Sequence, residues 1–215
     1  MSGKIWICGL GVLPPAETTL EALRAFERVP VVFSDVAEPG LRRWLGRFAK
    51  KVVKPASAAD LLRAARQGDC ALAVWGHPQF SSRLAREVEA AACKEGVPYE
   101  VLGAISPVGS AFARSISFLG GDYGYQGLQA YALETLLADG ELATPRLPLV
   151  VYCESAGKAG WARLCKTLAK KYPAGHAAVF YDGAARAMES TLERLAAKPP
   201  EGGVLLVAPN AALAR

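Results

Sequence analysis

The stretch "CALAVWGHPQF", residues 70–80, joins an uninterrupted apolar run to a turn that carries one of the chain's two histidines. An apolar run without polar alternation is typical of a parallel strand that is buried on both faces of a sheet. His77 stands between a glycine and a proline directly after that run. The stretch therefore predicts a central strand of an α/β sheet, followed by a turn at the carboxyl edge of the sheet, where ligands bind.

The same rhythm of an apolar run followed by an amphipathic stretch continues on both sides of residues 70–80. Further strands are predicted within residues 4–8, 31–33, 51–54 and 99–102, and helices within 18–28, 38–48, 57–68, 81–96 and 106–116. Strands that alternate with helices indicate a mostly parallel sheet that is covered on both faces. Residues 1–116 are therefore predicted to form an N-terminal α/β domain with glycine-rich turns.

The pattern changes after residue 116. Residues 118–127 are rich in glycine and tyrosine, residues 128–137 read as a strand or a short helix, and residues 138–148 form a polar connection. Three more strands are predicted within 147–153, 176–181 and 202–209, with an amphipathic helix from Trp161 to about Tyr172 whose aromatic ends are expected in the core. Residues 117–215 are predicted to form a second small α/β domain with a mixed or mostly parallel sheet. A cofactor cleft between the two domains is expected.

Composition sets only broad limits on function. The chain has 215 residues, of which 52% are hydrophobic, and no apolar run is long enough for a signal peptide or a membrane span, so a cytoplasmic protein without membrane contact is predicted. Its five cysteines show no CxxC spacing and are expected to be free and mostly buried. The net charge of +5 suits an anionic substrate or RNA, but the basic residues are spread along the sequence, so this signal is weak.

Three turns could carry chemistry, and each follows a predicted strand. "CGLGVLPP", residues 8–15, has only part of a dinucleotide-binding motif, and Pro14 and Pro15 remove amide donors that would hold a pyrophosphate. "WGHPQF" and "GAISPVGSAF", residues 75–80 and 103–112, follow the fourth and fifth strands. No carboxylate or thiol stands at ligand spacing from His77, and the sequence contains no GxSxG motif. These turns predict a pocket lined by backbone, with no metal.

Several of these segments, taken in order, resemble the tetrapyrrole methylase superfamily of S-adenosylmethionine (SAM) dependent methyltransferases. "IWICGLGVLPPAETTLEAL" resembles the opening strand, turn and helix of that superfamily, "VVFSD" its second strand, "VWGHP" its Gly-Asp-Pro loop, and "YEVLGAIS" its fifth strand and serine loop. Within the superfamily, Gly76-His77-Pro78 is most similar to the borosin-type branch, which methylates peptide backbones and has Gly-His-Pro in this loop. "YGYQGLQAYALETLL", "LPLVVYCESAG" and "GGVLLVAP" also resemble segments of that branch.

The chain also departs from the borosin-type pattern. That branch has a tyrosine-bearing substrate segment between the third strand and the next helix, whereas residues 50–62 here contain no tyrosine and leave no room for it. The tyrosine before Gly-His-Pro is replaced by Trp75, and the Pro-Gly of the serine loop is replaced by Gly103-Ala104. The resemblance is therefore stronger for the cofactor than for the substrate.

The resemblance implies a homodimer that binds SAM in the cleft between its domains and transfers a methyl group to a small molecule or peptide. The acceptor is expected to be a peptide or another natural-product intermediate, with a tetrapyrrole or RNA as the alternative, although a nucleic-acid partner is not favoured. A SAM-binding subunit without catalytic activity is the other alternative. The polar candidates for a base are Asp35, His77, Tyr131 and Asp182. The residues expected to line the cofactor are Trp75, Gly76, His77, Pro78, Phe80, Ser106, Pro107, Cys153, Gly183 and Pro209.

Overall fold

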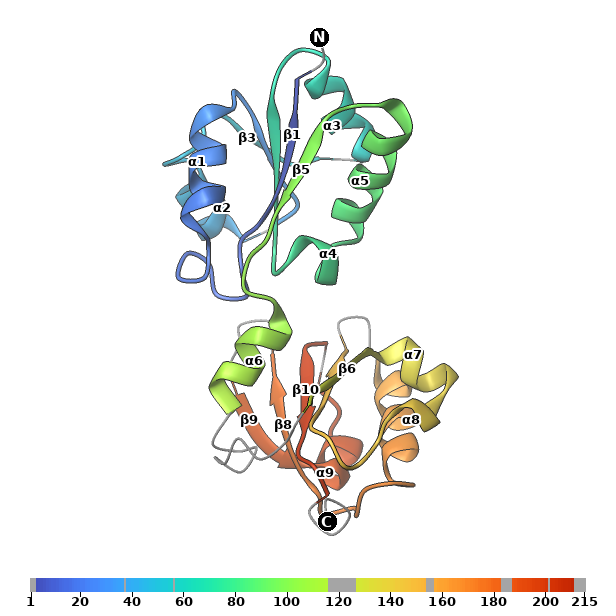
Figure 1. Cartoon of the computed structure of the whole chain (residues 1–215). Coiled ribbons are helices and arrows are strands. Elements are labelled where there is room, and N and C mark those ends of the chain that lie inside the picture. The colour runs from blue at the N-terminus through green and yellow to red at the C-terminus, as the bar shows by residue number, and fades with distance from the viewer. Residues whose placement is uncertain are drawn as a thin grey trace. The chain divides into compact units, whose positions relative to one another are not determined.

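A computed structural model describes residues 3–36, 38–55, 57–115, 127–153, 157–182, 187–200 and 202–210 of the chain. The chain divides into two compact units, residues 1–107 and 108–215, and each has a five-stranded sheet of its own (Figure 1). The α/β class predicted from the sequence is confirmed. The division places most of helix α6 (Pro107–Ser115) in the second unit, whereas the sequence pattern ended the first domain at residue 116, after this helix.

The sheet of the first unit is entirely parallel, with the strand order β3-β2-β4-β1-β5. Its strands are β1 (Ile5–Gly9), β2 (Val32–Ser34), β3 (Val52–Val53), β4 (Cys70–Val74) and β5 (Tyr99–Leu102). All residues of β4 are buried, as its uninterrupted apolar run predicts, because the strand has a neighbour on each side and helices over each face.

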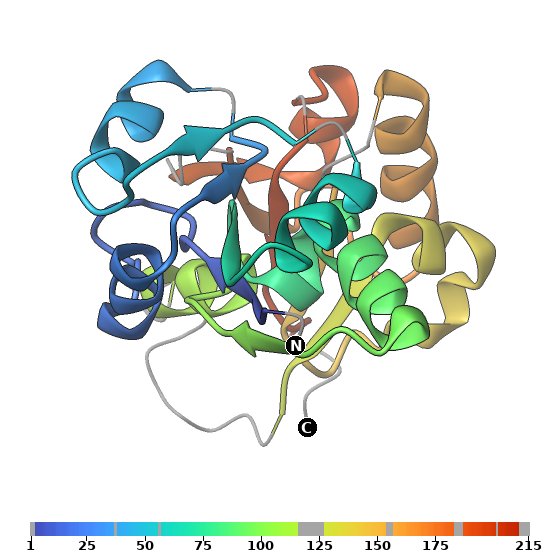
Figure 2. The same ribbon diagram turned by 90° about the horizontal axis from the view of Figure 1, so that it is seen from above.

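Helices cover both faces of this sheet, and Figures 1 and 2 show the strands between two pairs of helices. Helices α1 (Leu20–Arg28) and α2 (Pro39–Leu45) pack on one face, where Phe26 and Leu45 are fully buried. Helices α3 (Ala58–Ala65) and α5 (Arg83–Glu95) pack on the other face around Leu61 and Val88. The short helix α4 (Pro78–Ser81) precedes α5.

The second unit has a mixed sheet with the strand order β6-β7-β10-β8-β9. Strands β6 (Gln129–Ala132) and β7 (Leu149–Tyr152) are parallel, and the pairs that join β7, β10 (Val204–Val207), β8 (Ala177–Tyr181) and β9 (Ala187–Thr191) are antiparallel. One face packs on α7 (Leu133–Ala138), α8 (Lys158–Leu168) and α9 (Leu192–Ala197), around the fully buried Trp161. Val108 of α6 packs with the other face.

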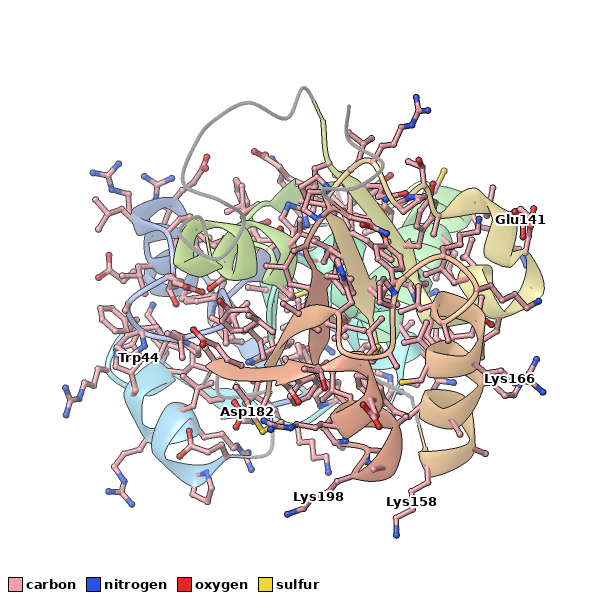
Figure 3. The ribbon with its side chains drawn as sticks, turned by 90° about the horizontal axis from the view of Figure 1, so that it is seen from below. Trp44, Glu141, Lys158, Lys166, Asp182 and Lys198 are labelled. Atoms are coloured by element: carbon pink, nitrogen blue, oxygen red, sulfur yellow. The ribbon has the colours of Figure 1, made fainter. Side chains whose placement is uncertain are left out.

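Lys171 fastens the connection between α7 and β7 to the end of α8. Its ammonium group donates to the carbonyl of Glu141 at 3.1 Å and to that of Ala143 at 2.8 Å. The same group pairs with the Glu141 carboxylate at 3.1 Å, and the Lys171 side chain is only 15% exposed. Glu141 belongs to the 3-10 turn η1 (Gly140–Leu142), so one lysine satisfies two main-chain acceptors of an irregular segment. By contrast, Lys166 is exposed and its side chain projects outward from α8 (Figure 3).

The structure corrects the sequence-based elements of the second unit in three places. Residues 128–137 form both a strand and a helix, β6 and α7, where one or the other was expected. The helix that begins before Trp161 ends at Leu168, although Tyr172 beyond it is still buried, at 2% exposure. Strand β9 and helix α9 were not predicted, because the residues of β9 are exposed or half-buried and give no apolar run.

Candidate functional site

The strand order of the first sheet reverses between the neighbouring strands β1 and β4. These strands are neighbours, but the helix that follows β1 covers one face of the sheet and the helices that follow β4 cover the other. Open α/β sheets bind ligands at the carboxyl ends of their strands at such a point. Strand β5 lies on the other side of β1 and is parallel to it, so the loop that follows β5 begins at the same edge of the sheet. We call residues 9–18, 75–82 and 103–107, which follow β1, β4 and β5, the three-loop site.

Two glycines join the first two loops of the site through their main chains. Gly76 N–H donates to the Gly11 carbonyl at 2.9 Å, and Gly11 N–H donates to the Gly76 carbonyl at 3.2 Å. Gly76 has a φ angle of 70° and Gly11 one of 77°, in the left-handed region that side chains disfavour. From the sequence, Gly11 was predicted only as a turn residue, and Gly76 as a turn residue that lines the cofactor. The structure shows that they hold the two loops in a fixed register.

Gly9, the last residue of β1, allows the other two loops to close over the strand end. A Cβ atom on Gly9 would lie 2.6 Å from the Gly76 carbonyl oxygen, 2.7 Å from Ala104 Cβ and 2.9 Å from Pro78 Cδ. These distances are shorter than any van der Waals contact, and the atoms belong to main chain or to short side chains that cannot turn away. The two loops therefore meet above β1 only because this position has no side chain.

His77 caps the short helix α4. Its Nδ1 atom accepts a hydrogen bond from the Gln79 N–H at 3.3 Å, and its carbonyl accepts from the Phe80 N–H at 3.0 Å. The ring lies edge to face against Phe80, with 6.0 Å between ring centroids. A Cβ atom on Gly103 would lie 3.1 Å from His77 Nε2, so the ring reaches the third loop. The second loop is therefore ordered by its own histidine.

The first loop is filled by a carboxylate of its own chain. The Glu17 carboxylate accepts the Val12 N–H at 2.7 Å and the Leu13 N–H at 3.0 Å. The Thr18 hydroxyl closes the same loop by donating to the Leu10 carbonyl at 2.8 Å. These are amides that a phosphate-binding loop would offer to its ligand. The structure thus supports the interpretation that residues 8–15 do not bind a dinucleotide, although nothing in the sequence pointed to Glu17.

The other cofactor candidates of the first unit also lie in the three-loop site. Trp75 and Ser106 are half-buried, Pro78 and Pro107 are buried, and Phe80 is exposed at 52%. An exposed phenylalanine beside a capped turn offers an apolar surface to a ligand, whereas the two prolines fix the main chain on which α4 and α6 begin.

Asp35 follows β2, which lies on the other side of β4, and so comes to the same edge of the sheet. Its side chain is exposed, yet partial desolvation raises the pKa of its carboxyl above the usual value. Of the base candidates at this edge, Asp35 is more exposed than His77. A role for Asp35 as the base stays a prediction.

The candidates of the second unit are less favourably placed for side-chain chemistry. The Tyr131 hydroxyl donates to the Leu142 carbonyl at 3.2 Å, so its proton is already engaged. Cys153 is fully buried in the core, where desolvation raises the pKa of its thiol, and a ligand contact would have to come from its main chain. Asp182 directly follows β8 (Figure 3), and Pro209 follows β10 and is half-buried. Gly183 lies outside the described residues, and a cofactor role for this set stays a prediction.

Within the described parts of the chain, no group of three or more His, Cys, Asp or Glu side chains could hold a metal ion. Helices long and apolar enough to cross a bilayer are likewise absent from these parts. All five cysteines are free; four are buried, and Cys93 is exposed. Burial raises the pKa of Cys8 and Cys165 and brings that of Cys70 to about 12. The buried thiols are therefore not nucleophiles at neutral pH.

Comparison with known proteins extends over nearly the whole chain. The family model described as Tetrapyrrole (Corrin/Porphyrin) Methylases matches residues 4–200. No curated protein matches the chain.

Solved structures of methyltransferases share the fold. Uroporphyrin-III C-methyltransferase from Thermus thermophilus, complexed with S-adenosyl homocysteine, has a TM-score of 0.72 at 23% identity, covering 95% of this chain and 97% of that one. The methyltransferase CobJ has a TM-score of 0.73 at 17% identity, covering 98% and 95%. The cobalt precorrin-4 methyltransferase CbiF has a TM-score of 0.71 at 15% identity, covering 95% and 94%.

Proposed function

This chain belongs to the tetrapyrrole (corrin/porphyrin) methylase family, and on that premise we propose that its three-loop site holds SAM and that the methyl group passes to a peptide or another natural-product intermediate. Methyl transfer from SAM itself follows from the family: the chain is a SAM-dependent methyltransferase. The sequence resemblance to this superfamily is thereby confirmed, and the borosin-type branch remains part of the proposal.

The shape of the three-loop site supports a bound cofactor. Gly9, Gly76 and Gly103 leave main chain where other residues would place side chains, and the loops that carry them meet above β1. The residues that would hold SAM there are Trp75, Gly76, His77, Pro78, Phe80, Ser106 and Pro107. An aromatic face such as that of Trp75 would stabilise a sulfonium cation by about 0.5–2 kcal/mol.

A site with few ionisable side chains suits this reaction. When bound, SAM supplies an activated methyl group together with its leaving group. The chain then has to hold the cofactor in one position and exclude water, which rigid turns accomplish without an acid or a metal. A base is needed only if the acceptor atom must lose a proton, and Asp35, exposed at the same sheet edge, is then the residue we propose.

Two acceptor classes each have an observation in their favour. Gly76-His77-Pro78, where the wider superfamily has Gly-Asp-Pro, favours the peptide or natural-product acceptor through its borosin-type resemblance. A tetrapyrrole is the second candidate, because the matching family is named for corrin and porphyrin methylases and similar solved proteins are named for uroporphyrin-III and cobalt precorrin-4. The absence of a tyrosine-bearing segment in residues 50–62 weakens the peptide proposal and leaves the tetrapyrrole untouched.

Calorimetric titration with SAM and S-adenosyl homocysteine tests the cofactor site. The double variant Gly76→Val with Pro78→Ala places a branched side chain at a φ of 70° and removes the proline that begins α4, so we expect binding to weaken at least about tenfold. Gly175→Ala is the matched control, since a Cβ atom there meets nothing within 4 Å. Unchanged affinity of the double variant would show that the cofactor lies elsewhere, and no binding by the natural protein at millimolar concentration would refute the function.

Mass spectrometry with isotope-labelled SAM tests the acceptor. The purified protein is incubated with labelled SAM and uroporphyrinogen III in one reaction, and with a peptide and small-molecule extract of its source cells in another. Label in a peptide or a non-tetrapyrrole metabolite supports the first acceptor class. Label confined to the uroporphyrinogen supports the second and overturns the first.

A further inference from the structure

We infer that His77 is a positioning residue whose neutral ring carries its proton on Nε2, and that it is not the base of the reaction. The inference deepens the proposed function, because it assigns a role to one residue of the three-loop site. It argues against His77 as one of the base candidates predicted from the sequence.

The first step is the hydrogen bond at Nδ1. The Gln79 N–H donates to this atom at 3.3 Å, in the way that the side-chain oxygen of aspartate or asparagine caps a helix. Pro78, the first residue of α4, has no N–H, so the Gln79 N–H is the first donor of this helix. A nitrogen that accepts this bond must present its lone pair. The proton of the neutral ring therefore lies on Nε2.

The second step is the enclosure of the ring. His77 has an extended main chain, with φ of −98° and ψ of 130°, and follows Gly76, whose main chain is paired with Gly11 in both directions. Phe80 lies edge to face against one side of the imidazole, and Gly103 of the third loop leaves room for Nε2. The ring thus connects the second loop to the third, and a change at any of these positions would move it.

The chemical consequence follows from the two nitrogens together. Nδ1 cannot take up a proton without losing the Gln79 bond and uncapping α4. Nε2 already carries the proton of the neutral ring, so it can donate but cannot accept. His77 can therefore hold a loop in place and present an N–H, whereas abstracting a proton from a methyl acceptor would require the opposite tautomer.

Three substitutions separate capping from base chemistry. His77→Asn keeps an acceptor at the δ position and removes Nε2, His77→Gln moves the polar atoms one bond further out and loses the cap, and His77→Ala removes both. We expect the Asn variant, which keeps the cap but loses the ring, to bind SAM more weakly than the natural protein but more tightly than the Ala and Gln variants. The Ala and Gln variants should bind about fivefold more weakly or worse, the equivalent of the ~1 kcal/mol of a lost helix cap. Rescue by asparagine alone is the signature of a cap.

Nitrogen NMR of the ligand-free protein, labelled at histidine, provides the second readout. The expected spectrum at pH 8 shows a lone-pair nitrogen at Nδ1 and a protonated nitrogen at Nε2 of His77, and Gly103→Ala should shift these resonances whereas Gly175→Ala should not. A proton on Nδ1, or an Asn variant as weak as the Ala variant, would overturn the inference. If the natural protein binds no SAM, the proposed function fails, but the tautomer of His77 in the ligand-free protein still tests the inference.

Discussion

Substitution of Gly9 by alanine is the sharpest test of how the three loops meet. The added methyl group would lie 2.6 Å from the Gly76 carbonyl oxygen, 2.7 Å from Ala104 Cβ and 2.9 Å from Pro78 Cδ, where carbon atoms normally stay about 3.5–4.0 Å apart. None of these atoms is the end of a flexible side chain, so the second and third loops must move by several tenths of an ångström or more.

The expected cost of this overpacking is about 1–3 kcal/mol of unfolding free energy. In a chain of this length, 1 kcal/mol corresponds to a shift of about 2–4 °C in melting temperature, so Gly9→Ala should melt about 2–12 °C lower. Because the loops that would hold SAM are the ones displaced, its affinity for SAM should also fall at least about tenfold, as measured by calorimetry.

Gly175→Ala serves as the control, since it adds the same methyl group in open space and should change unfolding by no more than about 0.5 kcal/mol. The reasoning is refuted if Gly9→Ala melts with the natural protein and binds SAM equally well, because the loops would then not be in contact above β1. A lower melting temperature with unchanged SAM affinity would confirm the packing and refute the placement of the cofactor.

Three further predictions concern other parts of the chain. Lys171→Met should lower the free energy of unfolding in urea by about 1–3 kcal/mol, because two carbonyl groups lose a partly buried ammonium donor. Lys166→Met, on the exposed side of α8, should leave it unchanged, and equal urea midpoints for the two variants would contradict this prediction. A thiol-specific disulfide reagent at pH 7.5 should modify one thiol of five in the folded protein, Cys93, and all five in urea, and a Cys93→Ser variant that still reacts when folded would show that a second thiol is accessible. Burial raises the pKa of Tyr172 from 10.0 to about 12, so the folded state keeps a proton that the unfolded state loses, and stability should fall by about 2 kcal/mol as the pH rises from 10 to 12. Tyr172→Phe should lessen this alkaline loss in denaturation midpoints measured at intervals of pH, and an identical slope for the two proteins would argue against the raised pKa.

Much of the fold could be predicted from the sequence because local pattern and final burial agree in the first unit. The run at residues 70–74 is apolar throughout, and β4 is buried at every position in the middle of the parallel sheet. The second unit was harder to predict, because β9 is an exposed edge strand whose side chains need not be apolar. The parallel pairing of β6 with β7 also could not be predicted from the sequence, since it depends on the path of the chain between these two strands.

The candidate site, like the fold, could be predicted only in part from the sequence. The sequence by itself determined that turns with glycine and proline follow the strands at 5–9, 70–74 and 99–102, because parallel strands end at one edge and such turns interrupt them. Only the tertiary structure decided that these turns touch: Gly9 is packed against the loops of β4 and β5, and Gly11 is paired with Gly76. It also decided which atoms are engaged, since Glu17 fills the first loop and the Gln79 N–H takes the lone pair of His77. Such contacts depend on strand order and on distances across loops, which no local pattern of residues encodes.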